Sequence, residues 1–353
     1  MKRIFIILLV AVLTSCNSDH NSTLENCEKV DLILQVTSPT MESSRNEASG
    51  LDSALGAIDN FDNNSEFWEE YDLRYILEIY EVITSGSEKT ISESPIYKRQ
   101  VQTTDNYNTD GIQFKMQVVP NRTYQFVVWA DFVTDGKAED LYYNTTDLRA
   151  ISRKEEFKHV AMQEALDAYH ICKTETIKKK STIDLTLSRP MAKLRVVALD
   201  YNEINDYSNP TNVSVKFDTE NNPVYKTFNA ITDEISNNCS AHEYTYSVNP
   251  MPYKEYTATT TDGQNLSGFV LFSDYIFTPR DIIAEQKNEY PVSFSLTIIY
   301  DNDEQISNKI DFDTQIPLSR NYLTTVVGNC LTQEENFIIE IDDTLLMGEE
   351  ITK

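Results

Sequence analysis

The sequence of 353 residues is short of glycine and of positive charge, and each shortage excludes a class of function. It contains only 9 glycines and no Gly-x-Gly pair, so it lacks the glycine-rich loops that bind dinucleotides and nucleoside triphosphates. Lysine and arginine number 30 against 56 aspartates and glutamates, which gives a formal net charge of -26. Because such a charge repels phosphate, we expect no nucleic acid among the partners.

Motifs of catalysis and metal binding are also missing. There is no Gly-x-Ser-x-Gly turn for a nucleophilic serine, and the four histidines do not have the spacing of a zinc site. We therefore expect no enzyme activity, cofactor or metal. A hydrolase with two carboxylates about 5–10 Å apart remains an alternative, because acidic residues are abundant. Two acidic clusters could hold calcium, although solvated turns are the favoured interpretation. The clusters are Asp59, Asp62 and Glu66, and Asp301, Asp303 and Glu304.

The start of the chain predicts export and lipid attachment. Lys2 and Arg3 precede an apolar run from Ile4 to Leu13, which is shorter than the roughly 20 residues that span a bilayer. Leu13-Thr14-Ser15-Cys16 follows and resembles the lipobox of bacterial lipoproteins. Residues 1–15 are then a signal peptide, Cys16 carries acyl chains such as palmitate, and residues 16–28 form a tether. We expect a protein anchored in the outer membrane by lipid, at the cell surface.

The remaining cysteines leave their chemistry open. Cys27, Cys172, Cys239 and Cys330 are far apart in the sequence and contain no Cys-x-x-Cys pair. An oxidising compartment permits disulfides among them, and four thiols allow three pairings. Buried free thiols are an equally good interpretation.

Apolar residues alternate with polar ones through most of the chain, which predicts a mainly β protein. In Val30–Val36 the apolar residues fall on one face, and Ile112–Val118 alternates in the same way. Alternation indicates strands with one face on a core and one in solvent, as in antiparallel β-sandwiches. Further strands are expected at 73–82, 97–103, 124–132, 183–188, 192–199, 213–217, 269–272, 292–300, 307–312, 322–327 and 337–341.

Helical signal is sparse and predicts one or two short helices. The best segment is Lys154–His170, and residues 51–60 are a second candidate. Residues 173–180 are expected to form a solvated connector. Pro190 cannot donate to a strand ladder and follows Arg189, so we place a domain boundary there. The predicted domains are residues 29–189 and 190–353, both β-sandwiches.

Aromatic residues raise an alternative function. Trp68, Trp129 and 20 tyrosines, with the pairs Tyr142-Tyr143 and Tyr71/Tyr75, could form a platform for sugar rings. Trp129 lies within a predicted strand, so a place in the core is the favoured interpretation. A surface glycan-binding lipoprotein is therefore kept as the second hypothesis.

Five segments resemble those of bacterial fimbrillin-like lipoproteins, in particular a family of uncharacterised function related to the subunits and anchors of fimbriae. The Arg-Pro-x-Ala-Lys and Arg-Asn-Tyr-x-Thr-Thr-x-x-Gly stretches are the most specific. The segments are Leu73–Tyr80, Tyr124–Asp131, Leu141–Thr145, Leu187–Arg195 and Arg320–Gly328. The resemblance implies two tandem transthyretin-like β-sandwich domains, attachment to the outer membrane, and a part in fimbriae or adhesion. Its implied partners are other fimbrial subunits or host surface ligands, and it implies no catalytic residue or cofactor.

The resemblance also implies a route of assembly. In fimbrillins a protease cuts after an arginine and releases the first strand, and a strand of a neighbouring subunit fills the vacated position. Here a cut after Arg45 would release the strand that carries Val30, Leu32, Leu34 and Val36. The expected donor strand lies near the C-terminus and carries Phe337, Ile339 and Ile341. Without the cut, the chain would serve as a membrane-attached tip or anchor.

Overall fold

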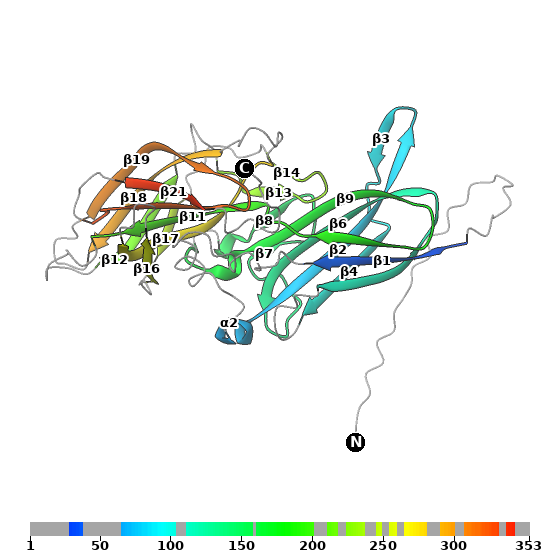
Figure 1. The fold of residues 1–353 in the computed structure, drawn as a ribbon, viewed down its shortest axis with the longest axis horizontal. Helices are drawn as coiled ribbons and strands as arrows, with labels where there is room; N and C mark the ends of the chain where they lie inside the picture. The colour runs from blue at the N-terminus through cyan, green and yellow to red at the C-terminus, as the bar shows by residue number, and fades with distance from the viewer. Residues whose placement is uncertain are drawn as a thin grey trace, which may run out of the picture.

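The computed structural model describes twelve stretches of the chain. They are residues 28–37, 65–103, 111–157, 160–200, 210–217, 224–236, 245–248, 254–259, 265–280, 290–300, 307–331 and 337–342. Within them almost all regular structure is β, as the alternating pattern predicts. The strands form an elongated body, with the early strands at one end and the late strands at the other (Figure 1).

The early part of the chain forms two sheets around a shared core. Sheet A has the order β10 (Ser181–Thr186), β1 (Val30–Thr37), β5 (Ile112–Val118). Sheet B has the order β3 (Glu88–Ile91), β2 (Tyr71–Ser85), β6 (Arg122–Thr134), β9 (Ala168–Ile177), and β4 (Tyr97–Thr103) also pairs with β2. Buried residues of both sheets belong to one hydrophobic cluster, so the sheets pack as a sandwich.

The late part of the chain forms a second pair of sheets. Sheet D has the order β16 (Lys254–Thr259), β17 (Asn265–Phe277), β11 (Met191–Ala198), β20 (Leu323–Gly328), β21 (Phe337–Asp342). Sheet E has the order β15 (Thr245–Val248), β12 (Pro210–Phe217), β18 (Tyr290–Tyr300), β19 (Ser307–Leu318). Their inward residues form a second cluster.

The same strand plan occurs in both parts. β1 lies between the antiparallel strand β5 and the parallel strand β10, and β11 lies between the antiparallel strand β17 and the parallel strand β20. Sheet D differs from sheet A in having β16 and β21 as additional strands. No repeat is visible in the sequence, because a sandwich constrains the polarity of its positions and not their identity.

A small sheet joins the two parts. Sheet C has the order β14 (Glu234–Ile235), β13 (Thr227–Asn229), β8 (Ile151–Arg153), β7 (Tyr143–Asn144). It therefore contains strands from both sides of the boundary placed at residues 189 and 190. Phe228 and Phe277 from the late part belong to the core of the early part. The division into two domains at residue 190 stays a prediction, because this sheet and this core cross it.

The predicted helix at Lys154–His170 is wrong. In its described part, residues 154–157 and 160–170, the only helical structure is two 3-10 turns, η3 (Glu155–Phe157) and η4 (Glu164–Leu166), and β9 begins at Ala168. Met162 has φ 58, which an α-helix does not allow, and pairing of β9 with β6 outweighs the local helical pattern. The connector predicted at 173–180 is likewise wrong up to Ile177, and only residues 178–180 form an exposed turn.

The described part of the chain holds one α-helix, α2 (Ser65–Glu70), in keeping with the one or two short helices expected. The helix predicted over residues 51–60 lies outside the described residues. So do Cys16, Arg45 and five of the six residues in the two acidic clusters; Glu66 lies in α2. The described His, Cys, Asp and Glu side chains include no group of three or more that could hold a metal ion.

Candidate functional site

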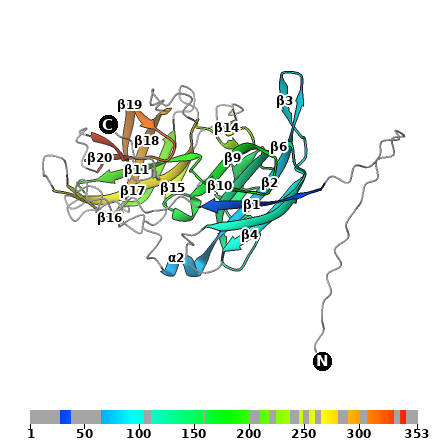
Figure 2. The same ribbon diagram turned by 45° about the vertical axis from the view of Figure 1, so that its right-hand side comes forward.

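The strand predicted to be released, β1, occupies the middle of sheet A. It pairs with β5 from Val30 opposite Val118 to Val36 opposite Ile112. On its other side it pairs in parallel with β10, from Leu32 opposite Ser181 to Thr37 opposite Thr186. In Figure 2 the dark blue strand lies in the near face of the molecule. Removal of β1 would therefore unpair one edge of β5 and one edge of β10 at once.

The inward side chains of β1 complete the core. Leu32, Leu34 and Val36 are all 0% exposed. Phe114 of β5 and Leu185 of β10, which pair with Leu34 and Val36, are also 0% exposed. Burial of three such side chains contributes roughly 5–9 kcal/mol of transfer free energy. The position of β1 is thus an apolar slot that must be filled for the early sandwich to be stable.

Polar pairs on the outer face hold β1 in register. The Gln113 side chain donates from Nε2 to Gln35 Oε1 at 2.7 Å. Gln117 Nε2 donates to Asp31 Oδ1 at 3.2 Å, again between residues that are direct partners in the ladder. Such cross-strand pairs favour one alignment over its neighbours by fractions of a kcal/mol each.

The strand predicted as donor, β21, lies at the edge of sheet D. It pairs with β20 from Leu323 opposite Asp342 to Gly328 opposite Phe337. Within the described residues it has no partner on its other side. An edge strand can leave by breaking one ladder, whereas a central strand must break two. Its backbone place therefore suits it better for donation than any inner strand of that sheet.

The two sequence segments most specific to the resemblance meet in space. They form β11 and β20, which lie side by side in parallel. Immediately before these strands, the Arg189 N–H donates to Asn321 Oδ1 at 2.7 Å. The Arg189 guanidinium forms an ion pair with Asp167 at 2.8 Å, and both side chains are almost completely buried. These segments therefore hold together the start of the late sheets. Their contacts give both segments a structural role.

Two ion pairs, each with one fully or almost fully buried partner, tie the early and late parts together. Arg153 of β8 binds Asp274 of β17 through two hydrogen bonds of 2.8 and 3.1 Å. Lys193 of β11 donates to Glu164 of η4 at 2.8 Å. Partners in such pairs must stay together, because an unpaired buried charge is costly. Nothing in the local sequence around Arg153 or Lys193 signalled these contacts, and sequence reasoning missed them.

His170 of β9 lies at the same junction. Its Nε2–H donates to the carbonyl oxygen of Ala230 at 2.7 Å, because a carbonyl can only accept. Asp233 lies 3.5 Å from Nδ1 and also accepts a hydrogen bond of 2.6 Å from Arg320. Burial lowers the pKa of His170 to about 4, so the ring is neutral at neutral pH.

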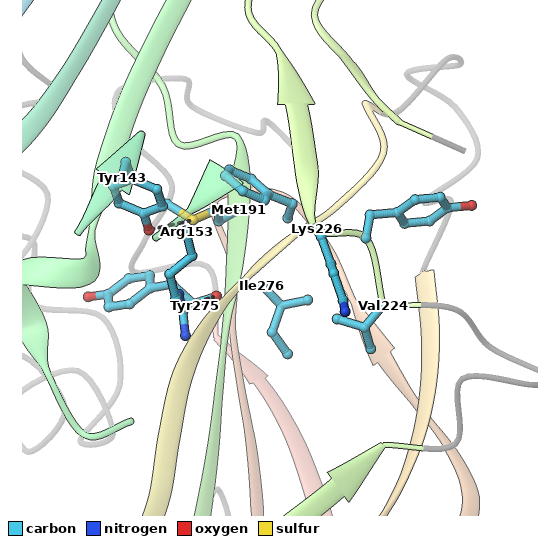
Figure 3. Close-up of a pocket in the computed structure, with 9 residues that line it drawn as sticks. Tyr143, Arg153, Met191, Val224, Lys226, Tyr275 and Ile276 are labelled. Atoms are coloured by element: carbon cyan, nitrogen blue, oxygen red, sulfur yellow. Dashed lines mark hydrogen bonds between the residues drawn. The ribbon is translucent and has the colours of Figure 1, made fainter. Parts of the chain in front are cut away.

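A small pocket opens between the two parts (Figure 3). It is lined by Tyr143, Arg153, Met191, Val224, Tyr225, Lys226, Tyr275, Ile276 and Phe277. Its volume is about 20 Å³, close to what one water molecule requires. A sugar ring or a peptide side chain does not fit in this space.

The aromatic residues considered for sugar binding are mostly in the core. Trp129 is 0% exposed, as expected for a strand residue, and it packs against Tyr143 and Phe228. Tyr75 and Tyr142 are also buried. Tyr71 is partly buried and its hydroxyl lies 3.3 Å from that of Tyr142. None of these described residues forms an exposed platform, and the side chain of Trp68 lies outside the described residues.

The two described cysteines are free thiols. Burial raises the pKa of Cys172 to about 11, and it also raises the pKa of Cys330. Both thiols are therefore protonated and unreactive at neutral pH. Cys27 and Cys239 lie outside the described residues.

This chain belongs to the family of unknown function DUF6562, which it matches over residues 23–350. This membership agrees with the family of uncharacterised function that the sequence resembles, and the fimbrial relationship stays a prediction. No curated protein matches the sequence.

Several solved structures share remote similarity with the chain. A proposed adhesin from Bacteroides thetaiotaomicron is 13% identical with a TM-score of 0.42, covering 90% of this chain and 98% of that one. A proposed polysaccharide-binding protein from the same organism is 11% identical with a TM-score of 0.42, covering 91% and 99%. A fimbrial assembly protein from Parabacteroides distasonis is 9% identical with a TM-score of 0.37, covering 89% and 95%. At TM-scores below 0.5 these similarities establish neither the fold nor the function of this chain.

Proposed function

For this member of the DUF6562 family we propose the role of a lipid-anchored adhesion protein of the outer membrane. In this role it is a fimbrial subunit, tip or anchor that assembles with neighbouring subunits by strand exchange. The observation that carries the proposal is the place of β1, a central strand with three fully buried apolar residues. A long segment, residues 38–64, separates β1 from α2.

The lipid anchor rests on the sequence. The short apolar run before Cys16 suits a lipoprotein signal, and the acidic mature chain suits exposure to water. Among the described residues, no helix combines the length and apolarity that crossing a bilayer requires. Several acyl chains on Cys16 would supply a stable attachment of their own.

The exchange step rests on the sheets. A cut after Arg45 would disconnect β1 from every later strand and open its position between β5 and β10. A strand from a neighbour would regain hydrogen bonds on both sides and refill the apolar slot. The edge strand β21 supplies such a strand, with alternate apolar residues Phe337, Ile339 and Ile341.

The experiment is analysis of the N-terminus of the protein isolated from cells, combined with protease treatment of intact cells. A subunit that polymerises is expected to begin at Asn46, and Arg45→Ala is expected to abolish that species. Lys29→Ala, on the other side of β1 and exposed, is the matched control. Digestion of the protein on intact cells is expected for a surface location.

Two results would change the proposal. Retention of lipidated Cys16 on every molecule would exclude the polymerising subunit and leave the anchor. Complete resistance to protease on intact cells, together with digestion after lysis, would contradict the surface location. Glycan binding is not proposed beside it, because no described aromatic platform or pocket supports it.

A further inference from the structure

Gly111 forms a notch at the end of the β1 position. Its φ is 69, and a Cβ atom added there would lie 2.0 Å from the carbonyl oxygen of Val36. The backbone of the strand in this position therefore approaches Gly111 more closely than any side chain would permit.

A second notch occupies the equivalent place in the late part. A Cβ atom on Gly268 of β17 would lie 2.3 Å from the carbonyl oxygen of Ala198. Gly111 precedes Ile112, which pairs with Val36, and Gly268 precedes Phe269, which pairs with Ala198. The notch thus recurs where the central strand of each plan ends. In both places the strand ends at, or one residue beyond, the residue that touches the glycine.

The sequence of β21 matches that of β1 over six positions. Residues 337–342 read Phe-Ile-Ile-Glu-Ile-Asp, and residues 32–37 read Leu-Ile-Leu-Gln-Val-Thr. Apolar residues coincide at the three fully buried positions and also at Ile33, which faces outward. Glutamate coincides with Gln35, and aspartate with Thr37. Both segments are also the last six residues of their strands.

Other alignments match less well. A shift of two residues toward the start of β1 brings Asp343 to the position of Val36, which is 0% exposed. A shift of two residues in the other direction places Glu335 at the position of Leu32. Each would bury a polar or charged residue in the apolar slot, which costs free energy. A shift of one residue in either direction turns Phe337, Ile339 and Ile341 outward and brings Glu340 to a fully buried position.

We propose that β21 of a second copy enters the vacated position in one register, with Phe337, Ile339 and Ile341 in the places of Leu32, Leu34 and Val36. Ile341 then presents its carbonyl to Gly111, and the strand runs in the direction of β1. Met116 of β5, the ladder partner of Leu32, is partly buried and can adapt to the larger phenylalanine. This inference rests on the proposed strand exchange and specifies its partner and alignment.

Disulfide trapping between two full-length chains tests the register. In this alignment Glu340 takes the place of Gln35, the ladder partner of Gln113. A Gln113→Cys chain and a Glu340→Cys chain are expressed in the same cells, and assemblies are oxidised and analysed by mass spectrometry. We expect the 113–340 link at least ten-fold above the links obtained with Ile338→Cys or Asp342→Cys chains. These two variants report a shift by two residues, and Ile338→Cys also reports a reversed strand.

The possible outcomes distinguish a failure of this register from a failure of the proposed strand exchange. Assemblies in which the 113–338 or 113–342 link dominates would overturn the register and leave strand exchange standing. Absence of assemblies and of every link would contradict strand exchange itself. Gly111→Ala in the acceptor chain should lower the 113–340 link several-fold. Gly86→Ala is its matched control, with φ 64 and no atom within 4 Å of the added Cβ, and equal yields for the two variants would overturn the role of the notch.

Discussion

The two central strands β1 and β11 occupy equivalent places but differ in how the chain holds them. β11 is connected to β10 through residues 187–190 and continues to Asp200, so the chain holds it at both ends. β1 is separated from the next described element, α2, by residues 38–64. One cut in this segment would disconnect β1 from all later strands, whereas β11 would need two. The same packing position can therefore be permanent in one sandwich and exchangeable in the other.

The strongest test of this comparison disrupts the junction. Arg153→Met removes the guanidinium from Asp274, whose side chain is 0% exposed. Loss of one partner of a buried ion pair costs about 3–5 kcal/mol. We expect the early and late parts to unfold in separate calorimetric transitions in this variant. Arg122→Met, at the exposed pair with Glu81, is the control and should cost less than about 1 kcal/mol. A single unshifted transition in Arg153→Met would show that the junction is not coupled through this pair.

Truncation of one fully buried leucine in each strand compares the two strands directly. Leu34→Ala in β1 and Leu194→Ala in β11 each empty a fully buried position and should cost about 2–5 kcal/mol. Hydrogen exchange is expected to distinguish them. Leu34→Ala should raise exchange in β1, β5 and β10 only, because β1 can leave alone, and Leu194→Ala should raise it throughout sheets D and E. If Leu34→Ala raised hydrogen exchange in sheets D and E as much as Leu194→Ala does, the result would contradict the proposal that β1 can be exchanged.

Acid should weaken the junction through His170. Its pKa is about 4 when folded and about 6.5 when unfolded, so the unfolded chain binds more protons between these values. This contribution is fully present above pH 6.5 and decreases by about 3 kcal/mol as the pH falls to 4. Asp233, Arg320 and Arg280 are the charged groups that act on the ring. The difference in unfolding free energy between wild type and His170→Gln should therefore shrink over this range, and a constant difference would contradict the assignment.

The smallest expected effect concerns the notches. Gly111→Ala and Gly268→Ala force a Cβ against a backbone carbonyl and should each cost about 1–3 kcal/mol. Gly86→Ala keeps the positive φ without the clash and should cost about 1 kcal/mol. Chemical denaturation of the three variants measures the difference. A similar loss in Gly111→Ala and Gly86→Ala, which both have a positive φ, would mean that the conformation of Gly111, and not its close approach to β1, is what the chain requires.

Local patterns in the sequence predicted much of the β structure. The strand at Tyr97–Thr103 has the expected limits, and Val30–Val36 and Ile112–Val118 differ by at most one residue. The alternating pattern did not predict β9, where pairing with β6 outweighs the local sequence pattern. It also did not predict the very short strands β7, β13 and β14. The candidate site was predicted as two isolated strands. Neither the parallel partner β10 nor the notch at Gly111 was foreseen, since both depend on residues distant in the sequence.

The sequence by itself determined that this protein consists mainly of strands with one face buried in a core. The alternation of apolar and polar residues that predicts such strands involves only neighbouring residues. It also determined that Trp129 lies in the core and that β1 and β21 carry similar side chains in the same order. Only the tertiary structure decided which strands are neighbours. Thr37 and Thr186 touch although 149 residues separate them, and no local pattern encodes such a pairing. The central place of β1, on which the proposed function depends, follows from that long-range choice.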